Sequence, residues 1–266
     1  MDTVKIAKKN VEMVAHRGLS GIEKENTCAA FLAAANRSYF GIETDVHVTK
    51  DGEFVVIHDE TLERISLGES VVNVEESDYN DFKDIVLPDT DGSRIRQDIR
   101  IPLLSEYISI CKKYDKICVL ELKKHFEEKD LERLVEQIRE MEYIDGVIFI
   151  SFDFKNCVNA RKLLPENAVQ WLTKDEEITE EIIEKLSENK LDIDIYYKRL
   201  NAENIALLHE NGIKVNCWTC DDKESAENLA DWGVDFTCLA RTMNGQKLPQ
   251  KNVRMMRRRP VGRLKT

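Results

Sequence analysis

The sequence predicts an α/β protein of the (β/α)8 TIM-barrel class, and three observations lead to this prediction. Eight short apolar segments alternate along the chain with amphipathic segments, which is the order of parallel strands and crossover helices. The 266 residues are 42% hydrophobic with 11 Gly and 5 Pro, so a sizeable core is available and a linker-rich chain is excluded. The competing doubly wound sheet usually carries a glycine-rich phosphate turn, and Gly18 and Gly21 do not form that motif.

The strand candidates are short apolar runs, and the helix candidates between them show apolar spacing of three and four residues. In the helix candidate 129–142, for instance, Leu131, Leu134 and Ile138 share one face. The predicted strands lie at 11–18, 40–48, 117–123, 146–152, 168–173, 191–197, 213–219 and 234–239. The predicted helices lie at 27–38, 103–114, 129–142, 154–164, 177–189, 201–211 and 222–231.

An irregularity follows the second predicted strand. Residues 54–59 form a short extra strand candidate after Asp51-Gly52, a hairpin turn signal. Residues from about 60 to 100 are polar and poorly periodic, which predicts a small insertion: a lid, part of a substrate pocket or a packed surface excursion. We therefore expect one barrel domain over residues 1–246, with this insertion, and a basic tail over 247–266.

The charge is unevenly distributed. The formal net charge is −11, but the predicted tail holds eight basic and no acidic residues. The rest holds 31 basic and 50 acidic residues, a net charge of −19, which disfavours nonspecific binding of nucleic acid. The tail either folds back on the acidic body or contacts an anionic surface, such as a lipid leaflet, or a partner.

The chain shows no apolar run of the length that a signal peptide or a membrane helix needs, so we expect a soluble, cytoplasmic protein. The seven cysteines are odd in number and mostly sit inside apolar runs, which predicts buried, reduced thiols. Cys217 and Cys220 match a CxxC pattern, but a strand would point their sulfurs to opposite faces.

Three carboxylates are expected to meet at the carboxyl ends of the predicted strands, where barrel active sites lie. Glu43 and Asp45 are two residues apart on one strand and share a face, and Glu121 ends the next barrel strand. Converging carboxylates repel one another unless a cation lies between them, and oxygen-only ligands favour Mg²⁺ or Ca²⁺. The alternative is a salt-bridge cluster, for instance of Glu121 with Arg17 and Lys123.

Two histidines are candidates for general acid–base catalysis. His16 ends the first strand and His58 follows the extra strand, so they could flank a bound group from opposite sides. Arg17 offers a planar fork and Lys123 a point charge to a phosphate. The other three histidines are predicted to lie outside the site, namely His47 one step past the carboxylates, and His125 and His209 at the surface.

Several motifs together resemble the glycerophosphodiester phosphodiesterase family. The most specific is GIETDVHVTKDGEFVVIHDETLER at 41–64, with ExD, TKDG and HD in the family's order and spacing. The shorter matches are AHRG (15–18), ENT (25–27), AAF (29–31), IPLLSEY (101–107) and ELK (121–123). The resemblance extends over roughly residues 11–240.

This resemblance implies a TIM barrel with a small insertion after strand two that hydrolyses glycerophosphodiesters to sn-glycerol 3-phosphate and an alcohol, with one divalent cation. It implies a role for each matched residue: metal ligands at Glu43, Asp45 and Glu121, an acid–base pair at His16 and His58, phosphate contacts at Arg17 and Lys123, a supporting carboxylate at Glu25, and a glycerol-pocket wall at Trp218. Lys24 replaces the Pro of the family's PENT motif, and Leu239-Ala240 replaces a Thr-Asp after the last strand.

In the implied mechanism one histidine takes a proton from the attacking hydroxyl and the other protonates the leaving alcohol. His16 as base and His58 as acid is the preferred assignment, and the reverse stays open. Attack by the substrate's own hydroxyl, through a cyclic phosphate, and direct attack by water both stay open. The expected partner is a small-molecule glycerophosphodiester rather than a nucleic acid, and no oligomeric state is predicted. The alternatives are a lysophospholipase D-type phosphodiesterase, a metal-dependent aldolase-like barrel enzyme and a non-catalytic binding barrel.

Overall fold

The computed structural model describes residues 11–239, and its centre is a closed barrel of eight parallel strands. Going round the barrel, each strand pairs with the next barrel strand in the sequence, and the last pairs with the first. This confirms the predicted fold class. The barrel strands are β1 (Glu12–Ala15), β2 (Gly41–Val48), β4 (Ile117–Leu122), β5 (Val147–Ser151), β6 (Val169–Thr173), β7 (Asp192–Tyr196), β8 (Val215–Trp218) and β9 (Phe236–Leu239).

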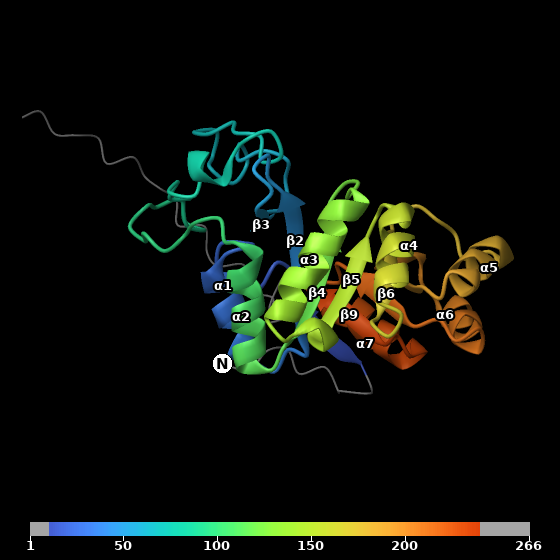
Figure 1. Ribbon diagram of the computed structural model, residues 1–266. Helices are drawn as coiled ribbons and strands as arrows, with labels where there is room; N and C mark the ends of the chain where they lie inside the picture. The colour runs from blue at the N-terminus through green and yellow to red at the C-terminus, as the bar shows by residue number, and fades with distance from the viewer. Residues whose placement is uncertain (1–10, 240–266) are drawn as a thin grey trace, which may run out of the picture.

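The helices pack around the outside of the barrel, where α3 and α4 can be followed in Figure 1. Each begins within about three residues of its predicted start, and side chains such as Thr27 and Asp222 cap the first turns. The helices are α1 (Cys28–Ala35), α2 (Leu104–Tyr114), α3 (Glu128–Glu140), α4 (Phe154–Leu163), α5 (Glu180–Glu188), α6 (Ala202–Glu210) and α7 (Lys223–Trp232). Short 3-10 turns are η1 (Tyr79–Asp81), η2 (Ile144–Gly146) and η3 (Tyr197–Arg199).

The alternation of side chains along the strands separates two environments. On β4, Leu120 and Leu122 belong to the large apolar core between strands and helices. Val119 belongs to a smaller apolar cluster that includes Val14 of β1. Glu121 shares the face of Val119, because residues two apart on a strand point the same way. The sequence therefore directs this carboxylate away from the helix layer.

The insertion after the second barrel strand is a packed lobe. The short strand β3 (Phe54–Val56) pairs antiparallel with β2, as the hairpin signal predicts. Figure 1 shows the following segment, coloured cyan to green, at the end of the barrel toward which β2 and β5 point. Its apolar side chains form a cluster of their own: Val55, Ile57, Leu62, Ile65, Val74, Phe82, Leu87, Ile99 and Ile101. The lobe is thus packed around its own apolar cluster, and a part in a substrate pocket stays open.

Two further predictions can be compared with residues 11–239. All seven cysteines are free thiols, six of them buried and Cys28 partly buried, as expected. Within this range, no helix is both long and apolar enough to cross a membrane. The predicted tail over 247–266 and Ala240 lie outside the described residues, and the division of the chain at residue 246 stays a prediction.

Candidate active site

The turn after β1 brings backbone and side-chain donors to the carboxylates. Arg17 and Gly18 both adopt left-handed conformations, with φ of 54° and 74°. A Cβ atom on Gly18 would lie 2.7 Å from the carbonyl carbon of Ala30, so the close approach of α1 requires glycine here. The turn directs the Arg17 backbone N–H onto Glu43 Oε2, which accepts a hydrogen bond of 2.7 Å. Strained backbone at a non-glycine residue is typical of functional sites.

The three predicted carboxylates converge. Glu43 and Asp45 come from β2 and Glu121 from β4, where Asp45 and Glu121 are partners in the strand register. All three residues are buried, with exposed fractions of 3%, 1% and 8%. One oxygen from each lies within 4.8 Å of the others, a spacing that could hold a metal ion. The parity argument from the sequence thus predicted the geometry of this cluster.

Bringing three buried carboxylates together is electrostatically unfavourable, and two basic residues offset only part of this repulsion. Burial, and then the neighbouring Asp45 and Glu121, raise the pKa of Glu43 well above its ordinary value. Burial and Asp45 raise the pKa of Glu121 to about 7. Burial also favours neutral Asp45, but Lys123 and Arg17 overcome it and hold the pKa of Asp45 well below its usual range. One carboxylate is therefore firmly ionised, and the other two resist ionisation.

Arg17 and Lys123 reach the same carboxylates. Lys123 Nζ donates to Glu121 Oε1 at 2.7 Å and lies 3.3 Å from Asp45 Oδ1. Arg17 Nε lies 3.5 Å from Asp45 Oδ2. These ion pairs are the salt-bridge alternative considered from the sequence. They leave Asp45 Oδ1 buried without a hydrogen bond from any residue in 11–239, so the pairs do not satisfy the cluster fully.

The two predicted catalytic histidines occupy different environments. His16 Nε2 lies 4.0 Å from Glu43 Oε2, and burial, followed by the charge of Arg17, lowers the pKa of His16 to about 4. His58 is carried back by the β2–β3 hairpin, in which the Ile57 N–H donates to the carbonyl of Asp45. Burial lowers the pKa of His58, while Asp45 acts in the opposite direction. His16 is therefore neutral near pH 7.

Three further residues complete the site, and none was singled out from the sequence. Asp59 Oδ1 lies 2.6 Å from His58 Nδ1, and the HD dipeptide was the available signal. Asn26 donates from Nδ2 to Asp45 Oδ2 at 2.7 Å, and the ENT motif at 25–27 could have indicated it in the sequence. Arg64 of the insertion donates to Asp59 and to the supporting carboxylate Glu25. In the sequence, Arg64 is marked only by its position at the end of the longest family motif, residues 41–64.

Glu25 and Trp218 lie in different parts of this end of the barrel. Glu25 Oε1 accepts a hydrogen bond of 2.9 Å from Arg17 Nη1, which fits a supporting carboxylate. Trp218 ends β8 and stacks edge-to-face on Phe152, with ring centroids 5.5 Å apart. Tyr196 of β7 lies on Trp218 at 5.8 Å. Trp218 thus belongs to an aromatic cluster with Phe152 and Tyr196, and its part in a glycerol pocket stays a prediction.

The remaining histidines lie outside the catalytic cluster. His47 is buried, and its Nδ1 lies 2.7 Å from Glu75 Oε1, which joins β2 to the insertion. His125 and His209 are exposed, as predicted, and pair with Asp153 and Asp235.

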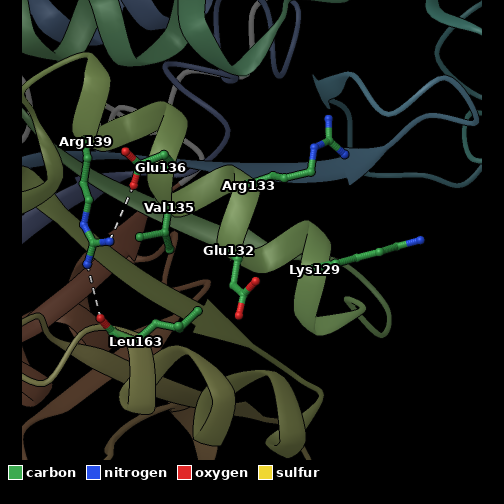
Figure 2. Close-up of a pocket in the computed structure, with 7 residues that line it drawn as sticks. All are labelled: Lys129, Glu132, Arg133, Val135, Glu136, Arg139 and Leu163. Atoms are coloured by element: carbon green, nitrogen blue, oxygen red, sulfur yellow. Dashed lines mark hydrogen bonds and ion pairs between the residues drawn. The ribbon is translucent and has the colours of Figure 1, made fainter.

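A hollow on the outer surface of α3 is a separate feature. There Arg139 lies 3.7 Å from Glu136 and donates to the carbonyl of Leu163 at 3.4 Å (Figure 2). The hollow is lined by helix-surface charges and includes none of the predicted site residues. It is therefore not a candidate active site.

Comparison with known proteins identifies the family. The family model of the glycerophosphoryl diester phosphodiesterase family matches residues 16–239, most of the chain. The chain belongs to this family. Membership confirms the resemblance seen in the sequence motifs and, with it, the enzyme class that they imply.

Individual proteins that carry the family's name are similar to this chain in sequence. A glycerophosphodiester phosphodiesterase of Caldanaerobacter subterraneus subsp. tengcongensis is 31% identical over 229 residues, which cover 84% of this chain and 91% of the relative. One of Bacillus altitudinis is 28% identical over 230 residues, with 84% and 92% covered.

Solved structures of the family also match. An Oleispira antarctica phosphodiesterase in complex with the product sn-glycerol-3-phosphate gives a TM-score of 0.79 at 25% identity, with 87% of this chain and 94% of that chain covered. A glycerophosphodiester phosphodiesterase of Parabacteroides distasonis gives 0.74 at 25% identity, with 88% and 94% covered.

Proposed function

We propose that this chain hydrolyses glycerophosphodiesters to sn-glycerol 3-phosphate and an alcohol, using one divalent cation and two histidines. The observation that carries the proposal is the convergence of three buried carboxylates beside Arg17 and Lys123. Membership of the family, and a relative in complex with sn-glycerol-3-phosphate, support the same substrate class.

The donor set at the cluster fits a hard divalent cation. Its ligands are carboxylate oxygens alone, which Mg²⁺ and Ca²⁺ prefer over zinc. Asp45 Oδ1 is buried without a hydrogen bond from the described chain, and Glu43 and Glu121 resist ionisation. A cation held by Glu43, Asp45 and Glu121 would supply positive charge that offsets the charge building on the phosphoryl oxygens.

The basic residues bind and orient the phosphate. Lys123 and Arg17 are partly exposed, with 15% and 18% of their side chains accessible, so both can meet a substrate. Arg17 presents a planar fork to two phosphate oxygens, and Lys123 adds a compact charge. Glu25 holds the Arg17 guanidinium in place through its hydrogen bond.

The two histidines divide the proton transfers. His16 is neutral at working pH and can accept the proton of the attacking hydroxyl. The carboxylate of Asp59 accepts a hydrogen bond from His58 Nδ1 and favours the protonated imidazolium against burial, and the Nε2 proton of that form is the one donated to the leaving alcohol. General acid–base catalysis of this kind contributes about 10²–10⁴-fold to the rate.

The attacking group can be the substrate's own hydroxyl or a water molecule. Attack by the glycerol 2-hydroxyl forms a cyclic phosphate, which water then opens. Single-turnover trapping with His58→Ala on glycerol 3-(p-nitrophenyl phosphate) distinguishes the routes. The nitrophenolate leaves without an acid, whereas opening of the cyclic phosphate by water lacks its base, so the cyclic product should accumulate. If no cyclic phosphate is found in any quench, the cyclic route is rejected.

The function is tested with a panel of glycerophosphodiesters that carry choline, ethanolamine, inositol or glycerol headgroups. Each is incubated with Mg²⁺ or Ca²⁺, and sn-glycerol 3-phosphate release is measured. Glu43→Ala should abolish turnover, whereas Glu184→Ala, an exposed carboxylate on α5, should leave it intact. Absence of turnover by the wild-type protein on every substrate with both cations would reject the proposal.

One observation favours a lysophospholipase D-type activity as a second candidate. The insertion exposes three aliphatic side chains, Leu67, Val71 and Ile95, with 65%, 70% and 85% of each accessible. An acylated substrate needs apolar surface to receive its chain, and these three side chains are the insertion's candidates for that contact. Release of lysophosphatidic acid from lysophosphatidylcholine, reduced by Ile95→Ser while glycerophosphocholine turnover is unchanged, would support this candidate.

The cytoplasmic location and the role of the basic tail stay predictions. Fractionation of cells that produce the full chain tests the first. For the second, deletion of residues 247–266 should weaken binding to anionic vesicles if the tail contacts lipid. Unchanged vesicle binding would leave the folded-back tail as the interpretation.

A further inference from the structure

Three consecutive residues of the loop between β1 and α1 are bonded to the insertion. Glu23 Oε2 accepts a bond of 2.6 Å from Arg96 Nη1. Lys24, the residue that replaces the family's proline, donates from Nζ to the carbonyl of Ile65 at 2.9 Å. Glu25 accepts two bonds from Arg64, of 2.7 and 2.9 Å. We refer to residues 23–25 and these partners as the clasp.

Arg64 differs from the other members of the clasp because it also donates to Asp59, the carboxylate that is hydrogen-bonded to His58. Its Nε donates to Asp59 Oδ2, and the other oxygen of Asp59 lies 2.6 Å from His58 Nδ1. On the opposite side of the network, Glu25 Oε1 also accepts a hydrogen bond of 2.9 Å from Arg17 Nη1. A continuous chain of charged hydrogen bonds therefore runs from His58 through Asp59, Arg64 and Glu25 to Arg17.

We propose that Arg64 is a positioning residue that sets the ring orientation and tautomer of His58 and the orientation of the Arg17 guanidinium. This inference rests on the proposed function for its catalytic consequence. The planar guanidinium donates from three nitrogens to two carboxylates at fixed angles, which an ammonium group does not reproduce. Asp59 held in this way accepts the Nδ1 proton of His58, so that Nε2 faces the substrate and carries the second proton when the ring is in its imidazolium form.

The charge balance of the network supports this assignment. Burial opposes ionisation of Glu25, but hydrogen bonds and charges from Arg64, together with Arg17, lower the pKa of Glu25 to about 2. Without Arg64, Glu25 would keep Arg17 alone, and Asp59 would keep only the imidazole. Both carboxylates would then be free to turn toward solvent.

The same contacts contribute little to folding, which makes the role testable. The Arg64 side chain is 51% exposed, and ion pairs this accessible to water stabilise proteins only weakly. Arg96 offers a matched control in the same insertion. It pairs with three carboxylates, those of Glu23, Asp89 and Asp98, at 35% exposure, and within residues 11–239 none of these pairs leads to a histidine. Loss of either arginine should therefore shift the melting temperature by similar, small amounts.

The experiment compares Arg64→Gln and Arg64→Lys with Arg96→Gln. Each is assayed with Mg²⁺ on glycerophosphocholine, whose leaving alcohol needs a proton, and on glycerol 3-(p-nitrophenyl phosphate), whose leaving group departs without one. We expect Arg64→Gln to lower kcat on glycerophosphocholine by about 10–100-fold, a fraction of what general acid catalysis contributes, with a smaller loss on the nitrophenyl ester. Arg64→Lys should recover only part of the loss, and Arg96→Gln should resemble the wild type.

A second measurement is independent of turnover. Nitrogen-15 NMR of the His58 ring, recorded at a pH at which the ring is neutral, should show the proton on Nδ1 in the wild type and in Arg96→Gln, and a mixed tautomer in Arg64→Gln. A His58 spectrum unchanged by Arg64→Gln would overturn the positioning of His58. Equal losses on both substrates would overturn it as well and leave only the orientation of Arg17 to Arg64. If the wild-type protein turned over neither these substrates nor the rest of the headgroup panel with Mg²⁺ or Ca²⁺, the proposed function would fail, and the His58 spectrum would still decide the role of Arg64.

Discussion

Replacing Glu121 by Gln should stabilise the metal-free protein at alkaline pH. Burial and Asp45 raise the pKa of Glu121 from 4.5 to about 7. A raised pKa means that the folded state binds a proton that the unfolded state releases, so this stability is present below pH 4.5 and is lost as the pH rises through 7. Each pKa unit corresponds to about 1.4 kcal/mol, so ionising this carboxyl in the folded state costs about 3 kcal/mol at pH 8.5.

Glutamine removes that cost because it carries no charge at any of these pH values. In EDTA at pH 8.5, the variant should therefore unfold at a temperature roughly 6–12 °C above the wild type. At pH 4 the two proteins should melt together, since Glu121 is then protonated in both states. Glu184→Gln, at an exposed carboxylate, should follow the wild type throughout.

Addition of Mg²⁺ or Ca²⁺ should reverse the order of the two melting temperatures, so that the wild type becomes the more stable protein. A cation that binds the folded state stabilises the wild type according to its concentration and affinity, whereas the variant lacks one ligand and gains less. The reasoning is refuted if Glu121→Gln is less stable than the wild type in EDTA at pH 8.5, or if the two proteins lose stability equally between pH 4 and pH 8.5. Thermal unfolding followed by circular dichroism measures both.

Three other perturbations have defined outcomes. In metal-free protein the His16 imidazole should titrate with a pKa of about 4, because burial and Arg17 disfavour its charged form; an NMR midpoint near the ordinary value of 6.5 would contradict this. Gly18→Ala should lower the free energy of unfolding by at least about 1–2 kcal/mol in urea titrations, since the left-handed backbone and the contact with Ala30 both oppose a Cβ. Gly68 also has a positive φ, but nothing lies near its Cβ position, so Gly68→Ala should lower the free energy of unfolding by less. Equal losses in the two variants would show that the contact with Ala30 does not contribute. Phe152→Ala should raise KM for glycerophosphodiesters several-fold with little change in melting temperature, because the ring is 48% exposed; an unchanged KM would place substrate elsewhere.

The carboxylate cluster was predictable because it depends on local rules. Strand parity places Glu43 and Asp45 on one face, and parallel pairing of consecutive barrel strands brings Glu121 opposite Asp45. The same rules predicted the β2–β3 hairpin and hence the return of His58. These side chains are positioned by secondary structure alone, so sequence periodicity is sufficient to find them.

The clasp was not predictable, because it joins segments that no periodic pattern relates. Arg64 and Glu25 are 39 residues apart, and the insertion between β3 and α2 contains little regular structure. Its fold depends on a small apolar cluster and on turns whose direction the residue pattern does not specify. The role of Asn26 depends likewise on a left-handed backbone, with φ of 53°, at a residue type that tolerates it without requiring it.

The acidic character of the barrel bears directly on how the site can bind a phosphate. Beside the proposed phosphate position, three carboxylates face two cations, Arg17 and Lys123. The basic side chains alone therefore leave the site without excess positive charge whenever the carboxylates are ionised. Protonation of Glu43 and Glu121 would correct the balance but would remove the anionic ligands, whereas a divalent cation corrects it while keeping them. The raised pKa values of Glu43 and Glu121 and the lack of excess positive charge are thus two consequences of one arrangement, and a bound divalent cation would offset both.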